Sequence, residues 1–350
     1  MTTLAIARRD ILGAGFGAVA AAVAPRFAAA NDEGPLAAQA FPGITEELAR
    51  TVIAPAFRQA TAKSVNIVPG LAVDAIAKIS ASPASPPLDV IILDDPTGLV
   101  AVSRGLVQTI PADKVPNGQD VPAKMHLNRG ITQTFQLIGL MYNAQRVQPA
   151  PTSWDDLWNP KFKGRVAIIG PDSSLGLAWM VNIAKARGGS EDDLEPAWKA
   201  LRDLVPNIAT IPRAPGSLVA LMEQGQIDIA VGYLSIVQPL RMRGSDVMLA
   251  KPSQGWSVVL NVAHIVTNSP NPGLAAAYIN AMMDPAVQTK LAGPPAFQFP
   301  TNAKVPYQGE IKNYVNSQDE LLTMITTDWA KINPQRSAII DRFNRDVRKG

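Results

Sequence analysis

The chain has 350 residues, of which 47% are hydrophobic, and it carries a formal net charge of +3 with no cysteine. This hydrophobic share excludes a disordered or purely fibrous protein, and the lack of cysteine excludes disulfides, thiol catalysis and thiolate metal sites. Arg8, Arg9, Arg26 and Asp10 together account for two of the positive charges, so the rest of the chain is close to neutral and does not indicate nucleic-acid binding.

The first thirty residues have the order of an export signal. Arg8 and Arg9 precede an uncharged run rich in Ala and Gly over residues 11–24, which is too short to cross a bilayer, and residues 28–30 are small, as signal peptidase requires. We therefore expect residues 1–30 to be a signal peptide and the mature chain to begin near Asn31. The adjacent arginines favour twin-arginine export, with the general secretory route as the alternative. Either route predicts an exported, periplasmic protein.

The remaining residues, about 320, suffice for two domains and contain no apolar stretch long enough for a transmembrane helix, so we expect no membrane insertion. Short apolar or β-branched runs predict strands over residues 64–70, 88–95, 136–143, 165–171, 227–233 and 257–268. Helical periodicity predicts helices over residues 73–82, 99–105 and 174–189. This alternation predicts an α/β protein with mostly parallel sheets.

Several of these segments together resemble a known family. They are LDVIILDDPTGLVAVSRGLVQTI from residue 88, GLMYNAQRV with PTSWDDLWNPKFKGRVAI over residues 139–168, GSLVALMEQGQIDIAVGY from residue 216, and NSPNPGLAAAYINAMMDPAVQTKLA from residue 268. In this order the chain resembles the extracellular solute-binding proteins of ABC importers, in the branch that includes polyamine-, iron- and thiamine-binding proteins. The likeness extends over nearly the whole chain after the signal.

The resemblance implies a type II periplasmic binding fold, in which two lobes, each a mostly parallel sheet flanked by helices, hold the ligand in a cleft between them. It places lobe 1 at residues 31–140 and 264–305, and lobe 2 at 141–263 and 306–350. The chain is then expected to cross between lobes near residues 139–143 and 261–264. The resemblance also implies a monomer whose partners are a small-molecule solute and an inner-membrane ABC permease with its ATPase.

In open α/β sheets, ligands bind beyond the carboxyl ends of the strands. Together with the resemblance, this rule selects twelve ligand-binding candidates: Phe41, Gly43, Gly70, Asp94, Asp95, Tyr142, Ser173, Ser174, Arg213, Ser217, Tyr233 and Trp256.

In the first lobe, Phe41 can stack on a ligand or simply pack behind a strand, and the backbone N–H groups after Gly70 can hold an anion. The adjacent Asp94 and Asp95 suit a cation, although Asp before proline also favours a turn and a helix start. Tyr142, at the first crossover, can donate its hydroxyl into the cleft.

In the second lobe, Ser173 and Ser174 open a helix, where hydroxyls and free N–H groups suit a carboxylate or phosphate, with plain N-capping as the alternative. Arg213 precedes a helix that begins near Ser217, which allows an anion clamp, although loop arginines are often only solvated. Tyr233 ends a strand where the family commonly has a ligand-facing residue, and Trp256 can form an aromatic wall.

The ligand class is narrowed by features that the sequence lacks. Relatives that bind iron use adjacent tyrosines, which are absent here, and two histidines without cysteine do not favour a metal site. Polyamine-binding relatives often have an acid where this chain has Gln254, and a tryptophan in the first loop, which is also absent. We therefore expect no cofactor and no metal, and favour an organic anion or amino-acid-like zwitterion. A polyamine-type cation is the alternative.

The sequence also bears on whether this protein is an enzyme or a binding protein. The mature sequence contains none of the motifs Gly-x-Ser-x-Gly, Ser-x-x-Lys, His-Glu-x-x-His, the P-loop or Gly-x-Gly-x-x-Gly. We therefore expect a binding protein and not an enzyme, with a periplasmic enzyme or a chemoreceptor partner as less favoured alternatives. Solute binding is expected to shift the lobes to a closed form that the permease recognises.

Overall fold

The computed structural model describes residues 36–212, 217–324 and 327–348. Its strands are β1 (Leu36–Ala40), β2 (Val65–Pro69), β3 (Val90–Asp94), β4 (Val107–Gln108), β5 (Ile131–Asn143), β6 (Val166–Ala167), β7 (Ile208–Thr210), β8 (Ile229–Tyr233), β9 (Val247–Ala250) and β10 (Ser257–Val266). Its α-helices are α1 (Ile44–Leu48), α2 (Ala54–Thr61), α3 (Ala72–Ala81), α4 (Asp95–Ser103), α5 (Ser174–Ala186), α6 (Glu195–Leu204), α7 (Ser217–Glu223), α8 (Leu234–Arg241), α9 (Pro272–Met282), α10 (Pro285–Ala292), α11 (Gln318–Met324), α12 (Trp329–Ile332) and α13 (Arg336–Phe343). Short 3-10 or π turns lie at Ala49–Ile53, Ala112–Lys114, Pro116–Asp120, Ala123–Met125, Trp154–Trp158, Pro160–Phe162, Val205–Asn207, Gly309–Asn313, Asn333–Gln335 and Asn344–Arg348.

The strands form a sheet with the order β2-β1-β3-β10-β5-β8-β6-β7, and β4 and β9 pair with β10 and β5 beside this path. β1 is parallel to β2 and β3, and β6 is parallel to β7 and β8. Between these two parallel groups, β10 and β5 run antiparallel to their neighbours. The α/β class predicted from the sequence is confirmed, and the antiparallel centre is an addition that the local patterns did not predict.

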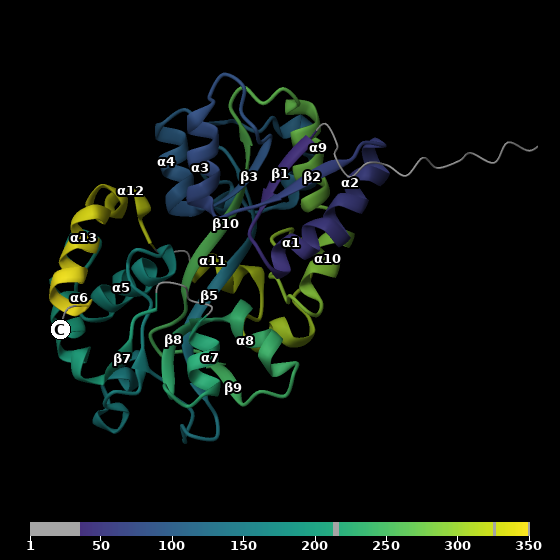
Figure 1. Cartoon of the computed structure of the whole chain (residues 1–350). Helices are drawn as coiled ribbons and strands as arrows, with labels where there is room; N and C mark the ends of the chain where they lie inside the picture. Colours follow the sequence, from purple (N-terminus) through teal and green to yellow (C-terminus); the bar gives the residue numbers. More distant parts are fainter. Residues whose placement is uncertain (1–35, 213–216, 325–326, 349–350) are drawn as a thin grey trace, which may run out of the picture. The chain divides into compact units, whose positions relative to one another are not determined.

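The two long central strands connect the parallel groups (Figure 1). β10 pairs with β3 through Asn261–Ile265 and with β5 from Ser257 to Ala263, and its register with β5 shifts between Asn261 and Val262. β5 pairs with β10 up to Ile138, and from Ile138 onward with β8 and then β9. Each central strand therefore changes partners close to the positions where the sequence predicted crossovers.

α5 is a largely buried helix that contacts the sheet. Its residues are apolar on nearly all sides, which suits a helix packed between α6 and β10. The first turn needs a glycine, because a Cβ on Gly176 would lie only 2.2 Å from the carbonyl oxygen of Gly170. This close approach places the beginning of α5 directly against the loop that follows β6.

The predicted elements differ from the observed ones mainly in length. The strand expected over residues 165–171 pairs only through Val166 and Ala167, because Gly170 and Pro171 turn the chain toward α5 and proline offers no N–H to a sheet. The strand expected to begin at residue 136 begins instead at Ile131.

Candidate functional site

A cavity of about 410 Å³ lies at the carboxyl ends of β1, β3 and β8. We call it the strand-end cavity. It is lined by Phe41, Pro42, Ile44, Thr45, Leu71, Asp94, Thr134, Gln136, Ser173, Ser174, Leu175, Tyr233, Ser235, Ile236, Val259, Asn261, Ala296 and Gln298. Five of the twelve predicted residues, Phe41, Asp94, Ser173, Ser174 and Tyr233, are therefore together in one cavity.

Asp94 combines two of the roles considered for it. It ends β3 and is the N-cap of α4, where its Oδ1 accepts a hydrogen bond from the N–H of Thr97 at 3.0 Å. The helix-start interpretation is therefore confirmed, and the same partly exposed side chain also lines the strand-end cavity. Asp94 is the single carboxylate among the lining residues described.

The start of α5 supplies hydroxyl groups and backbone N–H groups to the cavity. Ser173 is the N-cap, and its Oγ accepts from the N–H of Leu175 at 3.3 Å. Ser174 Oγ accepts from Nη2 of Arg336 at 3.4 Å. The N-capping alternative is thus confirmed for Ser173, while both serines line the cavity.

Tyr233 and the start of α8 form another part of the wall. Tyr233 ends β8 and occupies the N-cap position of α8, but it makes no side-chain capping bond to the helix. Burial raises the pKa of its hydroxyl to about 12, so the group remains a neutral hydrogen-bond donor at ordinary pH. Ser235 and Ile236 follow in the first turn of α8 and also line the cavity.

Asp95 is close to Asp94 in sequence but does not line the cavity. It is buried, with Oδ1 accepting from the N–H of Leu260 at 3.3 Å and Oδ2 accepting from Nε1 of Trp329 at 2.5 Å. Burial, aided by the charge of Asp94, raises the pKa of Asp95 well above its usual value. Asp95 therefore joins the start of α4 to β10 and α12 inside the protein.

Tyr142 and Trp256 also lie outside the lining set. Tyr142 is a buried residue of β5, and burial raises the pKa of its hydroxyl. Trp256 is buried, and its Nε1 donates to the carbonyl oxygen of Tyr314 at 3.2 Å. The indole lies against Gly139, where an added Cβ would be 2.4 Å from the ring. These contacts place Trp256 in the core.

The remaining candidates are backbone or loop positions. Gly43 precedes α1 with φ of 88°, a conformation that favours glycine, and Gly70 accepts from Gln39 Nε2 at 2.5 Å. Neither lines the cavity, although the neighbours Phe41 and Leu71 do. Ser217 begins α7 as an exposed residue away from the lining set. Arg213 lies outside the described residues.

The sequence analysis missed the part of the wall that comes from the central strands. Thr134 and Gln136 of β5 and Asn261 of β10 line the cavity together with Val259. They were detectable as polar residues within buried, otherwise apolar strands, at the two-residue spacing of one sheet face. Gln298, in the loop after α10, was also missed, and its buried Oε1 has no hydrogen-bond partner in the described structure.

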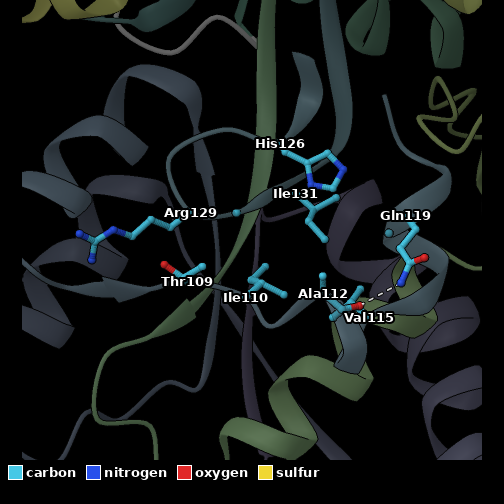
Figure 2. A pocket seen from close by; sticks show the side chains of 10 residues that line it. Thr109, Ile110, Ala112, Val115, Gln119, His126, Arg129 and Ile131 are labelled. Carbon is cyan, nitrogen blue, oxygen red and sulfur yellow. Dashed lines mark hydrogen bonds between the residues drawn. The ribbon is translucent and has the colours of Figure 1, made fainter. Parts of the chain in front are cut away.

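A second, smaller pocket of about 170 Å³ lies away from the strand ends (Figure 2). Its wall includes Ile110, Val115 and Ile131, and Figure 2 shows Gln119 hydrogen-bonded to Ala112 at one side. None of the twelve predicted residues lines this pocket. Arg129, His126 and Gln119 also line this pocket, but no carboxylate among the described residues does, so it does not pair opposite charges.

The part of the chain that the structure describes shows neither a metal cluster nor a membrane span. There, no group of three or more His, Cys, Asp or Glu side chains is arranged to hold a metal ion. Within the same residues, no helix combines the length and apolarity needed to cross a membrane.

Comparison with known proteins gives the family. The family model of the bacterial extracellular solute-binding proteins matches residues 85–334. The chain is 22% identical over 260 residues to the spermidine/putrescine-binding periplasmic protein of Escherichia coli K12, covering 71% of this chain and 73% of that one. It is 22% identical over 296 residues to a putative 2-aminoethylphosphonate-binding periplasmic protein of Salmonella typhimurium LT2, covering 83% and 85%.

The fold agrees with a solved structure of an ABC transporter protein from Clostridium perfringens, with a TM-score of 0.75, 23% identity, and coverage of 89% of this chain and 99% of that one. This likeness supports the two-lobed type II periplasmic binding fold. The family model covers more than half of the chain. The protein therefore belongs to the bacterial extracellular solute-binding proteins, the family that serves ABC importers.

Proposed function

We propose that this solute-binding protein captures a small organic zwitterion, or a simple organic anion, in the strand-end cavity and delivers it to a membrane permease powered by an ATPase. The charge pattern of the cavity wall supports this solute class. Asp94 shares the cavity with the first turns of α5 and α8, and no lysine, arginine or further carboxylate is found among the lining residues described.

The anionic end of the solute is assigned to the starts of α5 and α8. Helix N-termini present N–H groups without intrahelical partners, and the helix dipole favours negative charge there. The hydroxyls of Ser173, Ser174 and Ser235 add polar hydrogen atoms on the same wall. Since α8 has no side-chain cap, its first-turn N–H groups remain available to an anion.

The cationic end is assigned to Asp94, whose Oδ1 accepts from the N–H of Thr97 and whose other oxygen has no hydrogen-bond partner within the described chain. Phe41 and Ile236 offer apolar contact to the carbon skeleton between the two charged ends. The relative from Salmonella is named for 2-aminoethylphosphonate, a compound with one ammonium and one phosphonate group. Its two charges have the signs that this wall complements.

A diamine is the second candidate, because the relative from Escherichia coli is named for spermidine and putrescine. Two ammonium groups call for a carboxylate at each end of the site, and the described wall offers only Asp94. Gln254 does not extend the acidic set, since its Oε1 accepts from the N–H of Trp154 and its Nε2 donates to Ser153 Oγ. A zwitterion therefore agrees better with the wall than a diamine.

We further propose the lobe division given above, with residues 31–140 and 264–305 in one lobe and 141–263 and 306–350 in the other. The partner change of β5 at Ile138 and the register shift of β10 at Asn261 support these crossing points. Closure of the lobes on the solute is then the signal for the permease. The signal peptide at residues 1–30 and twin-arginine export stay predictions, because these residues lie outside the described structure.

The test uses purified, ligand-stripped protein with 2-aminoethylphosphonate, ethylphosphonate and putrescine. Thermal shift and titration calorimetry measure binding, since a ligand that binds only the folded state raises the melting temperature. Asp94→Asn keeps an N-cap but removes the charge, and should weaken 2-aminoethylphosphonate about tenfold or more while leaving ethylphosphonate unchanged. Asp284→Asn is the matched control, because Asp284 caps α10 outside this cavity.

A melting-temperature shift with putrescine alone would replace the zwitterion proposal with the diamine alternative. Equal affinity of wild type and Asp94→Asn for 2-aminoethylphosphonate would remove Asp94 from the site.

A further inference from the structure

The C-terminal segment, residues 327–348, lies beside α5 and α6 (Figure 1). It is fixed there by polar contacts: the N–H of Asp328 donates to Oε1 of Glu191 at 2.8 Å, and Arg342 donates to Oε2 of Glu195 at 3.0 Å. This segment supplies no lining residue to the strand-end cavity, but it brings an arginine to the cavity wall.

That arginine is Arg336, the first residue of α13. Its Nη2 lies 3.1 Å from the carbonyl oxygen of Asp172 and 3.4 Å from Oγ of Ser174. Ser174 lines the cavity, so the partly buried guanidinium is separated from the cavity by a single hydroxyl group. Both contacts of Arg336 are to neutral oxygens.

The other arginines of this segment are paired with acids. Arg342 pairs with Glu195, Arg345 with Asp346 at 2.9 Å, and Arg348 with Asp172 at 3.1 Å. Arg336 has no carboxylate within ion-pair distance in the described part of the chain, which makes it the exception in the segment.

Arg336, which has no acidic partner in the described residues, lies beside the start of α5, where the electrostatic potential is already positive. The start of α5 is the positive end of a helix, and a cation is unfavourable there unless an anion is near. The carboxylate of Asp172 is bonded to Arg348, and its single negative charge is smaller than the combined positive charge of Arg336, Arg348 and the helix start. The wall beside Ser174 is therefore electropositive, although no cationic side chain lines the cavity itself.

We infer that Arg336 determines the specificity of the strand-end cavity for the anionic end of the solute. This inference rests on the solute class proposed above and adds the residue that selects it. An anion bound at Ser173 and Ser174 supplies the compensating charge that Arg336 lacks. That attraction acts across the Ser174 hydroxyl, to which Arg336 donates at 3.4 Å. The C-terminal segment is then part of the binding site as well as of the scaffold.

The experiment compares Arg336→Gln and Arg336→Lys with Arg345→Gln, a control that removes an exposed arginine already paired with Asp346. Titration calorimetry with ethylphosphonate, 2-aminoethylphosphonate and putrescine gives the affinities, and circular dichroism with the unliganded melting temperature verifies folding. Arg336→Gln should weaken both phosphonates about tenfold, because it removes a unit charge that lies one hydroxyl group away from the bound anion. Arg336→Lys should recover part of this loss, and Arg345→Gln should bind as wild type does.

A structural defect lowers the unliganded melting temperature or alters the circular dichroism spectrum, whereas the loss of an anion-selecting charge lowers phosphonate affinity and leaves both as in wild type. Unchanged phosphonate affinity in Arg336→Gln overturns the inference. If that variant does not fold, a loss of tenfold or more in Arg336→Lys, which keeps the charge, overturns it as well.

The same data separate the two proposals. If 2-aminoethylphosphonate binds wild type and Arg336→Gln equally, the zwitterion proposal is supported and the role proposed for Arg336 is refuted. If only ethylphosphonate binds wild type and Arg336→Gln loses it, the role of Arg336 stands and the zwitterion proposal falls. If neither phosphonate binds wild type, both are wrong.

Discussion

Lowering the pH from 7 to 5 should destabilise the protein through His264, a residue of β10 that is fully buried. Neither of its ring nitrogens has a hydrogen-bond partner in the described structure. The ring is enclosed by Gly98 and Gly130, where added Cβ atoms would lie 3.1 Å from Nε2 and 2.6 Å from Nδ1. A charged imidazole therefore loses its contact with water at this position, and the backbone of Asn128 offsets that loss only in part.

The sign and size of the effect follow from the pKa of His264, which burial lowers from 6.5 to about 4. In the unfolded chain the imidazole takes up its proton near pH 6.5, while the folded protein resists it until about pH 4. The stability is thus fully present above pH 6.5 and is lost as the pH falls toward 4. Each pKa unit corresponds to about 1.4 kcal/mol, so the whole loss is about 3 kcal/mol, of which about 2 kcal/mol appears by pH 5.

The measurement is urea unfolding at pH 7 and pH 5, followed by tryptophan fluorescence, for wild type, His264→Leu and His126→Gln. His264→Leu removes the titrating ring and replaces it with an apolar side chain, so its free energy of unfolding should lose about 2 kcal/mol less over this range than that of wild type. His126 is exposed, and its replacement should leave the wild-type pH dependence intact. Carboxylates that titrate in the same range are common to all three proteins and cancel in the comparison.

The reasoning is refuted if wild type and His264→Leu lose equal stability between pH 7 and pH 5. The same holds if His126→Gln, and not His264→Leu, removes the pH dependence.

Two further substitutions test the packing that positions the cavity. Trp329→Phe leaves a buried oxygen of Asp95 without its indole donor and should lower the free energy of unfolding in urea by about 1 to 3 kcal/mol. Trp154→Phe should lower it less, because Nε1 of Trp154 has no partner in the described structure. Equal losses in the two variants would contradict a stabilising role of the Trp329–Asp95 hydrogen bond. Gly176→Ala forces a Cβ to 2.2 Å from a carbonyl oxygen of the preceding loop and should lower the free energy of unfolding by about 1 to 3 kcal/mol. Gly273→Ala, in an open part of α9, should be neutral or stabilising. An unchanged melting temperature in Gly176→Ala would show that the loop moves to accommodate the methyl group.

Much of the candidate site was accessible from local sequence patterns. Asp94 and Tyr233 end apolar runs, and Ser173 stands between a strand pattern and a helix pattern. Because the carboxyl ends of parallel strands lie at one edge of a sheet, residues in such positions meet even when they are far apart in the chain. The strand-end cavity contains all three.

Residues adjacent in sequence occupy different environments in the fold, and no local pattern distinguishes them. Asp94 lines the cavity, while Asp95 points into the protein and receives the indole N–H of Trp329, which is 234 residues away. Trp256 was expected as an aromatic wall, yet it packs on Gly139 of the opposing central strand. Only the packing of distant segments decides which side of a strand end faces a ligand.

The sequence by itself determined the α/β class and five of the residues that line the cavity, because periodicity and strand-end position depend on short stretches of chain, and its resemblance over nearly the whole mature chain indicated the family. The tertiary structure decided the rest: the antiparallel pairing of β5 with β10 brings Gln136 and Asn261 to the wall, and the return of the C-terminal segment brings Arg336 to Ser174. These contacts join residues more than a hundred positions apart, and their partners are selected by the global packing of the sheet and helices.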